Sequence, residues 1–214
     1  MRLVQISGSM HTLHQDPRSG NCFKAVLTAA QLGIPLKKVD IDVVSGFTRK
    51  PEFLAKNPNG RVPTLELDDG RLLPESNAII WYLAEGSPLI PSDRFARAQM
   101  LQWMFFEQYS HEPYIAVARY WLVFAPKDKL REKEHLVPEW HAKGNAALGV
   151  MEDHLQRHDW FVGGKYSLAD IALYAYTHCA EEGGFDLKKY RAVSDWLKRV
   201  TLTNDFVKMG AAGS

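Results

Sequence analysis

The stretch that decides the fold is a polar turn followed by two short extended segments. It reads Asn57-Pro58-Asn59-Gly60-Arg61-Val62-Pro63-Thr64-Leu65-Glu66-Leu67-Asp68-Asp69-Gly70-Arg71-Leu72-Leu73. Asparagine, proline and glycine in succession are typical of a turn. Apolar and polar residues then alternate from Val62 to Leu67, which predicts a strand. The Asp-Asp-Gly run at 68–70 predicts a hairpin turn, and Arg71–Leu73 the returning strand.

The residues before this hairpin alternate between strand and helix patterns. Val4–Ser7 predicts a short strand, and the polar stretch His11–Arg18 is interpreted as a loop. From Ser19 to Ala30 apolar residues recur on one helical face, and Lys38–Val43 has the period of a strand. A second helix is predicted near Pro51–Lys56. Strands joined by a crossover helix usually pair in parallel, so the opening predicts an α/β domain.

The residues after the hairpin predict helices only. A compact apolar helix covers 77–85, with Ser76 as its N-cap. Residues 86–92 are rich in Gly, Ser and Pro and are interpreted as a linker. Further helices are predicted at 98–109, at 116–124 after a break at 111–113, at 138–158, from Ser167 onward and at 193–200. Ser167 and Asp170 form a capping-box pattern, and Pro113 suits the first turn of a helix. We therefore expect an α/β domain at 1–85 and an all-α domain at 93–214.

Composition excludes several classes of protein. The 214 residues are 46% hydrophobic and 24% charged, with a formal net charge of +1, as in an ordinary globular protein rather than a nucleic-acid binder. We expect no membrane segment, because no apolar run approaches the roughly 20 residues that one requires. The N-terminus becomes polar too soon for a signal peptide. Only Cys22 and Cys179 are present, which excludes a disulfide scaffold and favours a reducing, cytoplasmic location.

Three short motifs are candidates for chemistry, and each also has a purely structural interpretation. Val62-Pro63 suits a turn at a sheet edge, and a cis bond there would turn the Val62 backbone outward to pair with an extended ligand. Glu75-Ser76 is either a helix cap or a holder of a ligand ammonium and carboxylate. Ser19 to Cys22 is either a cap with a small core residue or a place where helix amides stabilise a thiolate.

The sequence motifs give little support for a metal site or a nucleotide site. The histidine pairs His11/His14 and His154/His158 are at most half of a zinc site, so no metal is expected. Neither a phosphate-binding glycine loop nor a nucleophile-elbow motif occurs. The aromatic residues between 103 and 121 are interpreted as core, part of which could line a pocket where the two domains meet.

In this order the motifs resemble those of cytosolic glutathione transferases over nearly the full length. The matching pieces are Ser19–Cys22, 57–65, Glu75–Ile79 and Ser167–Ala172. The resemblance is to a serine-type or related bacterial-like class. It implies a thioredoxin-like N-terminal domain, an all-helical second domain, a cis bond before Pro63 and a homodimer.

The resemblance also implies a glutathione site. Glu75 and Ser76 match the pair that holds the γ-glutamyl end, and the Val62 backbone would bind the cysteinyl part. Arg61 and, more loosely, Lys50 are candidates for a glutathione carboxylate. The catalytic candidates are ranked Ser19, then Asn21, then Cys22. The electrophile would lie against Tyr109, His111, Tyr114, Ala118 and Trp121. By the same resemblance, the stretch His11–Arg18 is longer than expected and is interpreted as an insertion.

The function implied is conjugation of glutathione to small hydrophobic electrophiles, a detoxification reaction in which glutathione is the co-substrate. Two alternatives stay open at this point. One is glutathione-dependent reduction of peroxides or disulfides at the same site, with Cys22 as a possible redox residue. The other is a non-catalytic binding protein that keeps the fold.

Overall fold

The first compact unit is built on a mixed four-stranded sheet. A computed structural model describes residues 10–210, which divide into one unit up to Ile90 together with the segment from Asn204, and a second unit, Pro91–Thr203. The strand order is β2-β1-β3-β4. β1 pairs in parallel with β2 and antiparallel with β3, and β4 closes the hairpin. The strands are β1 (His11–Gln15), β2 (Leu36–Asp40), β3 (Thr64–Glu66) and β4 (Leu72–Pro74).

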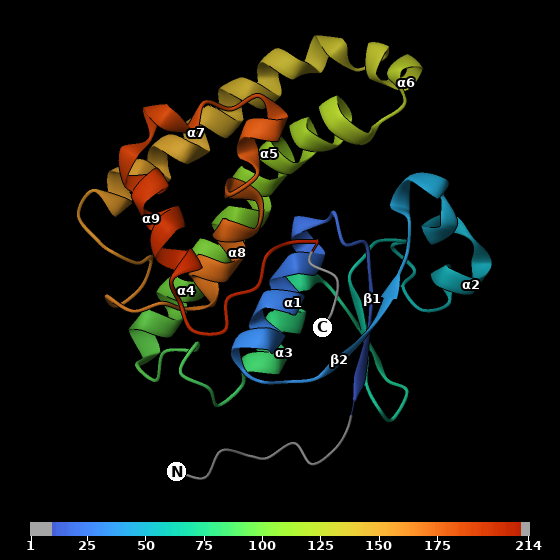
Figure 1. The fold of residues 1–214 in the computed structure, drawn as a ribbon, viewed down its shortest axis with the longest axis horizontal. Helices are drawn as coiled ribbons and strands as arrows, with labels where there is room; N and C mark the ends of the chain where they lie inside the picture. The colour runs from blue at the N-terminus through green and yellow to red at the C-terminus, as the bar shows by residue number, and fades with distance from the viewer. Residues whose placement is uncertain (1–9, 211–214) are drawn as a thin grey trace. The chain divides into compact units, whose positions relative to one another are not determined.

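Two helices cover one face of this sheet. α1 (Gly20–Gln31) and α3 (Ser76–Ala84) lie side by side, and α2 (Pro51–Leu54) lies on the other side of the strands (Figure 1). Two 3-10 turns, Val43–Ser45 and Phe47–Arg49, precede α2. The second predicted helix is therefore a single α-helical turn.

The prediction that His11–Arg18 is a loop is wrong. His11–Gln15 is the strand β1, so only three residues separate it from Ser19 and there is no insertion there. Its histidines look polar in sequence, but both side chains are buried, and His14 Nε2 lies 2.8 Å from Glu66 Oε2 on β3. This polar segment is a strand because its backbone pairs with β2 and β3, and because Glu66 on β3 is a partner for the buried His14 side chain. The predicted strand Val4–Ser7 lies outside the described residues.

The start of α3 also differs from the prediction. The N-cap is Glu75, without a side-chain capping bond, and Ser76 is the first helical residue. Ser76 Oγ instead donates a hydrogen bond to Asn21 Oδ1 at 3.2 Å. Ser76 is therefore not the cap, because its hydroxyl is engaged by a different helix.

The named elements of the second unit are α-helices, 3-10 turns and two π-helical turns. The predicted break at 111–113 is a π-helical turn, Glu107–His111, after which Pro113 lies in the first turn of α5, as predicted. A second π-helical turn, Tyr120–Phe124, follows α5. The helices are α4 (Arg94–Phe106), α5 (Glu112–Arg119), α6 (Lys127–Arg131), α7 (Val137–Leu155), α8 (Leu168–Thr177) and α9 (Arg191–Thr201).

The helix α8 is the core of this unit, because every one of its residues is buried. The predicted capping box is present at its start, where Ser167 N donates to Asp170 Oδ2 at 2.9 Å. Asp170 Oδ1 also accepts hydrogen bonds from Phe161 N at 3.3 Å and from Trp196 Nε1 on α9 at 3.0 Å. One carboxylate thus caps α8 and ties it to α9.

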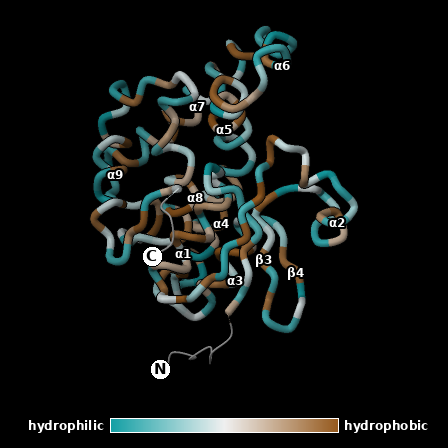
Figure 2. Tube along the Cα trace, turned by 45° about the vertical axis from the view of Figure 1, so that its right-hand side comes forward, coloured by the Kyte–Doolittle hydropathy of each residue, from teal (hydrophilic) through white to brown (hydrophobic). Residues whose placement is uncertain are grey.

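The helices α1, α5 and α9 are amphipathic. Hydrophobic and hydrophilic segments alternate along the tube in Figure 2. In residues 10–210 no helix is both long and apolar enough to cross a membrane.

Candidate active site

The turn between β1 and α1 holds Ser19 at the positive end of a helix. Ser19 is the N-cap of α1, as predicted, and its Oγ accepts a hydrogen bond from Cys22 N at 3.4 Å. Ser19 N donates to Asp16 O at 3.0 Å. The first amides of α1 and the helix dipole therefore surround the Ser19 hydroxyl, an environment that stabilises a nearby anion.

Asp16 holds this turn in place. Its carboxylate accepts hydrogen bonds from Arg18 N and Nε at 2.9 Å, from Arg18 Nη2 at 2.6 Å and from Val43 N at 3.1 Å. Arg18 also bridges to Asp42 Oδ1 at 2.6 Å. Burial acts to raise the pKa of Asp16, but the bonds from Arg18 and Val43 lower it below its usual value of 3.8. The ionised carboxylate thus links the turn to the segment after β2.

Cys22 lies inside the domain. Its side chain is 0% exposed, and Asp16 N donates to Sγ at 3.4 Å. Burial raises the pKa of the Cys22 thiol to about 12, although the bonds from Asp16 and Ser19 lower it. The thiol is therefore protonated at neutral pH and is not reachable from solvent.

A short chain of hydrogen bonds joins the starts of α1 and α3. Lys24 Nζ donates to Ser76 Oγ at 3.3 Å, and Ser76 Oγ donates to Asn21 Oδ1 at 3.2 Å. Lys24, which is 0% exposed on α1, is not among the site residues predicted from the sequence. Lysine is rarely fully buried unless its ammonium group has a partner, and the Ser76 hydroxyl is such a partner here. The available signal was weak: Lys24 is a lone cation in a helix otherwise made of small, apolar and neutral residues.

Glu75 has an unusual backbone for its residue type. Its φ is 72° and its side chain is exposed, directly before Ser76. A non-glycine residue with positive φ is strained, and such strain often marks a functional position. The strained backbone places an exposed carboxylate beside the N-terminus of α3.

The turn at 57–64 presents a free segment of backbone. Asn57 Nδ2 donates to Arg61 O at 2.7 Å, and the peptide bond between Val62 and Pro63 is cis. Within residues 10–210, no hydrogen bond involves the Val62 backbone, and no ion pair involves Arg61. Gly60 is required here, because a Cβ would lie 2.8 Å from Thr48 O at a φ of +61°.

The remaining predicted residues are Lys50 and the five electrophile candidates, and they lie in different units. Lys50 Nζ lies 5.3 Å from the centroid of the Phe47 ring. The five electrophile candidates all lie in the second unit. His111 and Ala118 are buried there, and His111 Nε2 is 2.9 Å from Thr177 Oγ1. Tyr109 is 83% exposed, whereas Tyr114 and Trp121 are half-buried, under Lys143 and against Trp140.

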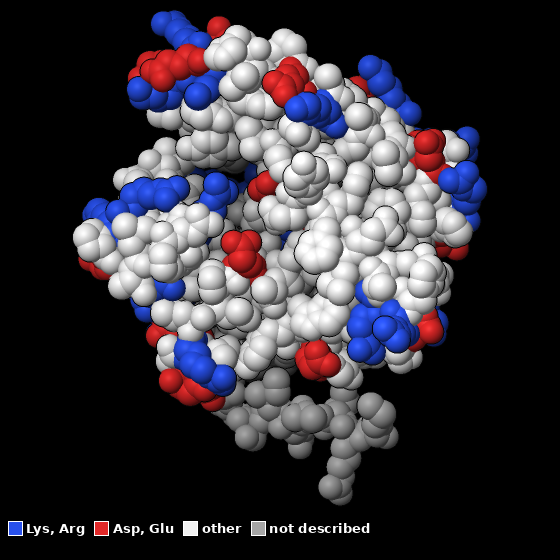
Figure 3. Space-filling model, turned by 180° about the vertical axis from the view of Figure 1, so that it is seen from behind, with Lys and Arg blue, Asp and Glu red and all other residues white. Residues whose placement is uncertain are grey.

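On the face shown in Figure 3, basic and acidic side chains are interspersed. Among residues 10–210, no three His, Cys, Asp or Glu side chains are grouped as metal ligands.

The fold and this site together define a class: proteins with a thioredoxin-like first domain followed by an all-helical second domain. Family models for the N-terminal and C-terminal domains of glutathione S-transferase match residues 18–85 and 102–202. The chain belongs to the glutathione transferase family, as the motifs had indicated.

Individual relatives agree with this assignment. The chain is 33% identical over 177 residues to glutathione S-transferase D7 of Drosophila melanogaster, covering 80% of this chain and 75% of the relative. It resembles the crystal structure of a glutathione S-transferase from Pseudomonas fluorescens Pf-5, with 49% identity and a TM-score of 0.89, over 93% of this chain and 98% of that one. It also resembles Ure2p in complex with glutathione, with 26% identity and a TM-score of 0.79, over 91% and 95%.

Proposed function

We propose that the protein conjugates the thiolate of glutathione to small hydrophobic electrophiles. One observation carries this proposal: hydrogen bonds from Lys24 through Ser76 to Asn21 join the start of α3 to the start of α1, where Ser19 is the N-cap. A ligand with an anionic end at α3 and a thiol at α1 would span these two helix starts. Glutathione has both groups.

Each part of glutathione has a matching group in the first unit. The γ-glutamyl ammonium pairs with the exposed Glu75 carboxylate, and the γ-glutamyl carboxylate is bound at Ser76 and the N-terminus of α3. The cysteinyl backbone pairs with the unengaged Val62 backbone. Arg61, and Lys50 more weakly, attract the glycyl carboxylate.

Ser19 supplies the chemistry. A free thiol has a pKa near 8.5, so only a few per cent is ionised at neutral pH. Lowering that pKa by about two units requires roughly 2.7 kcal/mol of preferential thiolate binding. A hydrogen bond from the Ser19 hydroxyl together with the N-terminus of α1 can provide this. The thiol proton leaves to solvent, and the sulfur lone pair forms the new bond to carbon while the leaving group departs with its electrons.

The second unit would supply the apolar surface for the electrophile. Tyr109, Tyr114 and Trp121 are the accessible members of the predicted set. The side chains of His111 and Ala118 are buried, so they would pack beneath this surface rather than contact the electrophile. The two free cysteines, both buried, suit a reducing compartment such as the cytoplasm.

The first test is a calorimetric titration of the whole protein with reduced glutathione, together with its Glu75→Ala variant. We expect one-to-one binding by the natural protein and at least about tenfold weaker binding by the variant, because a charge-assisted hydrogen bond is lost. Glu85→Ala, which removes an exposed acid at the other end of α3, serves as the matched control. Equal affinity for all three proteins would contradict the assigned site.

A panel of electrophiles, peroxides and mixed disulfides then separates transferase from the alternatives. A redox cycle through Cys22 is disfavoured by its burial and by its raised pKa of about 12. We therefore expect a Cys22→Ser variant to keep every activity. Glutathione binding without turnover of any compound in the panel would favour a binding protein instead.

A further inference from the structure

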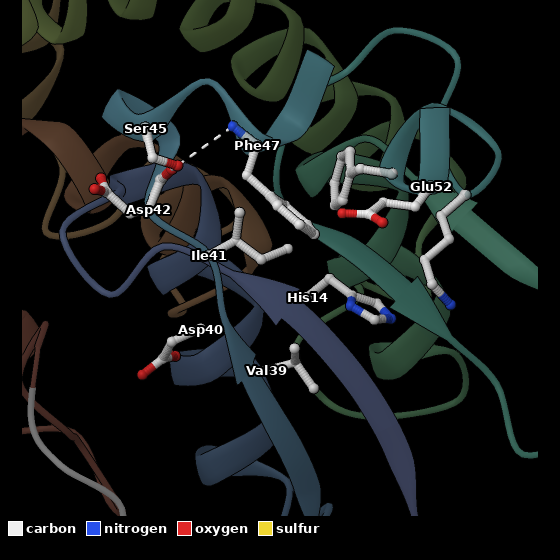
Figure 4. A pocket seen from close by; sticks show the side chains of 10 residues that line it. His14, Val39, Asp40, Ile41, Asp42, Ser45, Phe47 and Glu52 are labelled. Atoms are coloured by element: carbon white, nitrogen blue, oxygen red, sulfur yellow. Dashed lines mark hydrogen bonds between the residues drawn. The ribbon is translucent and has the colours of Figure 1, made fainter. Parts of the chain in front are cut away.

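A cavity of about 500 Å³ lies between the sheet and α2, on the face that α1 and α3 leave uncovered (Figure 4). Ligand pockets in proteins are commonly about 300–1,000 Å³. None of its lining residues belongs to the catalytic or glutathione-binding set assigned above. The cavity is lined by His14, Val39, Asp40, Ile41, Asp42, Ser45, Phe47, Glu52, Phe53 and Lys56.

The walls of this cavity are mainly apolar. Val39 and Ile41 project from β2 and from the residue after it, and the rings of Phe47 and Phe53 stand edge to face with centroids 6.3 Å apart. The cavity is open to solvent, so a guest that covers these apolar side chains removes them from water, which favours an apolar body. The two rings suit a flat aromatic body.

Most of the charged groups around the cavity are already engaged. Lys56 Nζ and His14 Nε2 both contact Glu66 Oε2, at 2.7 and 2.8 Å. Hydrogen bonds from Lys56 and His14 lower the pKa of Glu66, so this group is ionised at neutral pH. Asp40 accepts from Gln15 Nε2 at 2.9 Å, and Asp42 accepts from Arg18.

Glu52 is different. Within residues 10–210 no hydrogen bond or ion pair engages its carboxylate, which extends from α2 toward the Phe47 side of the cavity (Figure 4). A carboxylate and aromatic rings are the groups that recognise an organic cation.

We propose that this cavity is a second ligand site, which binds a small aromatic amine in its protonated form. The aromatic body lies between Val39, Ile41 and the two phenylalanine rings, and the ammonium is paired with Glu52. The inference is independent of the proposed transferase reaction, because it uses none of the residues that bind glutathione.

Tryptamine is a suitable probe, and indole-3-propionate is its acid counterpart with a similar body. We expect saturable one-to-one binding of tryptamine to the whole protein by calorimetry, unchanged by saturating glutathione. The acid is expected to bind at least about fivefold more weakly than tryptamine, because it loses the pair with Glu52 and is repelled by that carboxylate. Glu52→Gln should weaken tryptamine binding about fivefold, the size of a partly solvated ion pair. Glu85→Gln, at an exposed acid outside the cavity, is the control.

A second variant, Val39→Phe, projects a ring into the space assigned to the aromatic body and should prevent tryptamine binding while glutathione binding persists. If that variant does not fold, Glu52→Gln and the acid probe decide the matter. The proposal is overturned if tryptamine does not bind, if it binds Glu52→Gln as tightly as the natural protein, if the acid binds equally well, or if glutathione displaces it.

Discussion

Ser19 is the residue on which the proposed chemistry depends most directly. Replacing it by alanine removes the hydroxyl but leaves the amides of α1 in place. We expect the thiol pKa of bound glutathione to rise by about one unit and turnover at neutral pH to fall about tenfold or more, because one charge-assisted hydrogen bond is lost. Ultraviolet absorbance of the thiolate during a pH titration measures the first effect.

Ser45→Ala is the matched control for Ser19→Ala, since Ser45 is an exposed hydroxyl in the same unit that caps no α-helix. An unchanged thiol pKa in Ser19→Ala would transfer the role to Asn21, the second-ranked candidate.

We expect Lys24 to act through Ser76 rather than directly on the substrate. Lys24→Met keeps the length and the apolar stem but removes the donor to Ser76 Oγ. We expect the Kd for glutathione to rise about fivefold to tenfold, since a hydrogen bond from a charged donor contributes about 1.5–3 kcal/mol and part of it is recovered by repacking. Calorimetry measures this, with Lys38→Met, an exposed lysine on β2, as the control. A KM for glutathione that does not move would exclude this positioning role.

At the scale of the element, the turn between β1 and α1 depends on an ionised Asp16. The folded state lowers the pKa of this carboxyl, so the unfolded chain takes up a proton first as the pH falls. The stabilisation is present above the unfolded value of about 4 and is lost as the pH falls through the folded pKa. We expect the natural protein to lose more stability between pH 6 and pH 3 than the Asp16→Asn variant, as measured by urea unfolding.

Asp153→Asn is the control for this pH dependence, because Asp153 is exposed on α7 and has no hydrogen bond or ion pair within residues 10–210. Parallel pH profiles for the natural protein and Asp16→Asn would show that the turn does not depend on this charge.

At the scale of the whole molecule, we expect a homodimer in solution. The surface offers two large apolar side chains along α4: Phe95 is 70% exposed and Phe105 66%. Their spacing places both on one side of the helix, and large exposed apolar side chains on one helix face are candidates for an interface. Sedimentation should therefore show a dimer, which Phe105→Glu converts to monomer.

The control for the dimer is Leu202→Glu, since Leu202 is just as exposed but lies beyond α9. A natural protein that sediments as a monomer, or a Phe105→Glu variant that stays dimeric, would rule out this surface.

Local patterns in the sequence were sufficient wherever a short segment determines its own geometry. Ser19 as a cap, the capping box of Ser167 and Asp170, and the hairpin after Gly60 all follow from hydrogen bonds between near neighbours. The order of these motifs indicated the family and the fold class.

The tertiary structure decided what depends on distant partners. His11–Gln15 is a strand because β2 and β3 pair with it on either side, and the Ser76 hydroxyl turns to Asn21 because α1 packs against α3. Lys24 and the cavity beneath α2 could not be read from spacing, because both arise where segments remote in sequence meet. Periodicity describes one element at a time, whereas burial and side-chain pairing are properties of the packed chain.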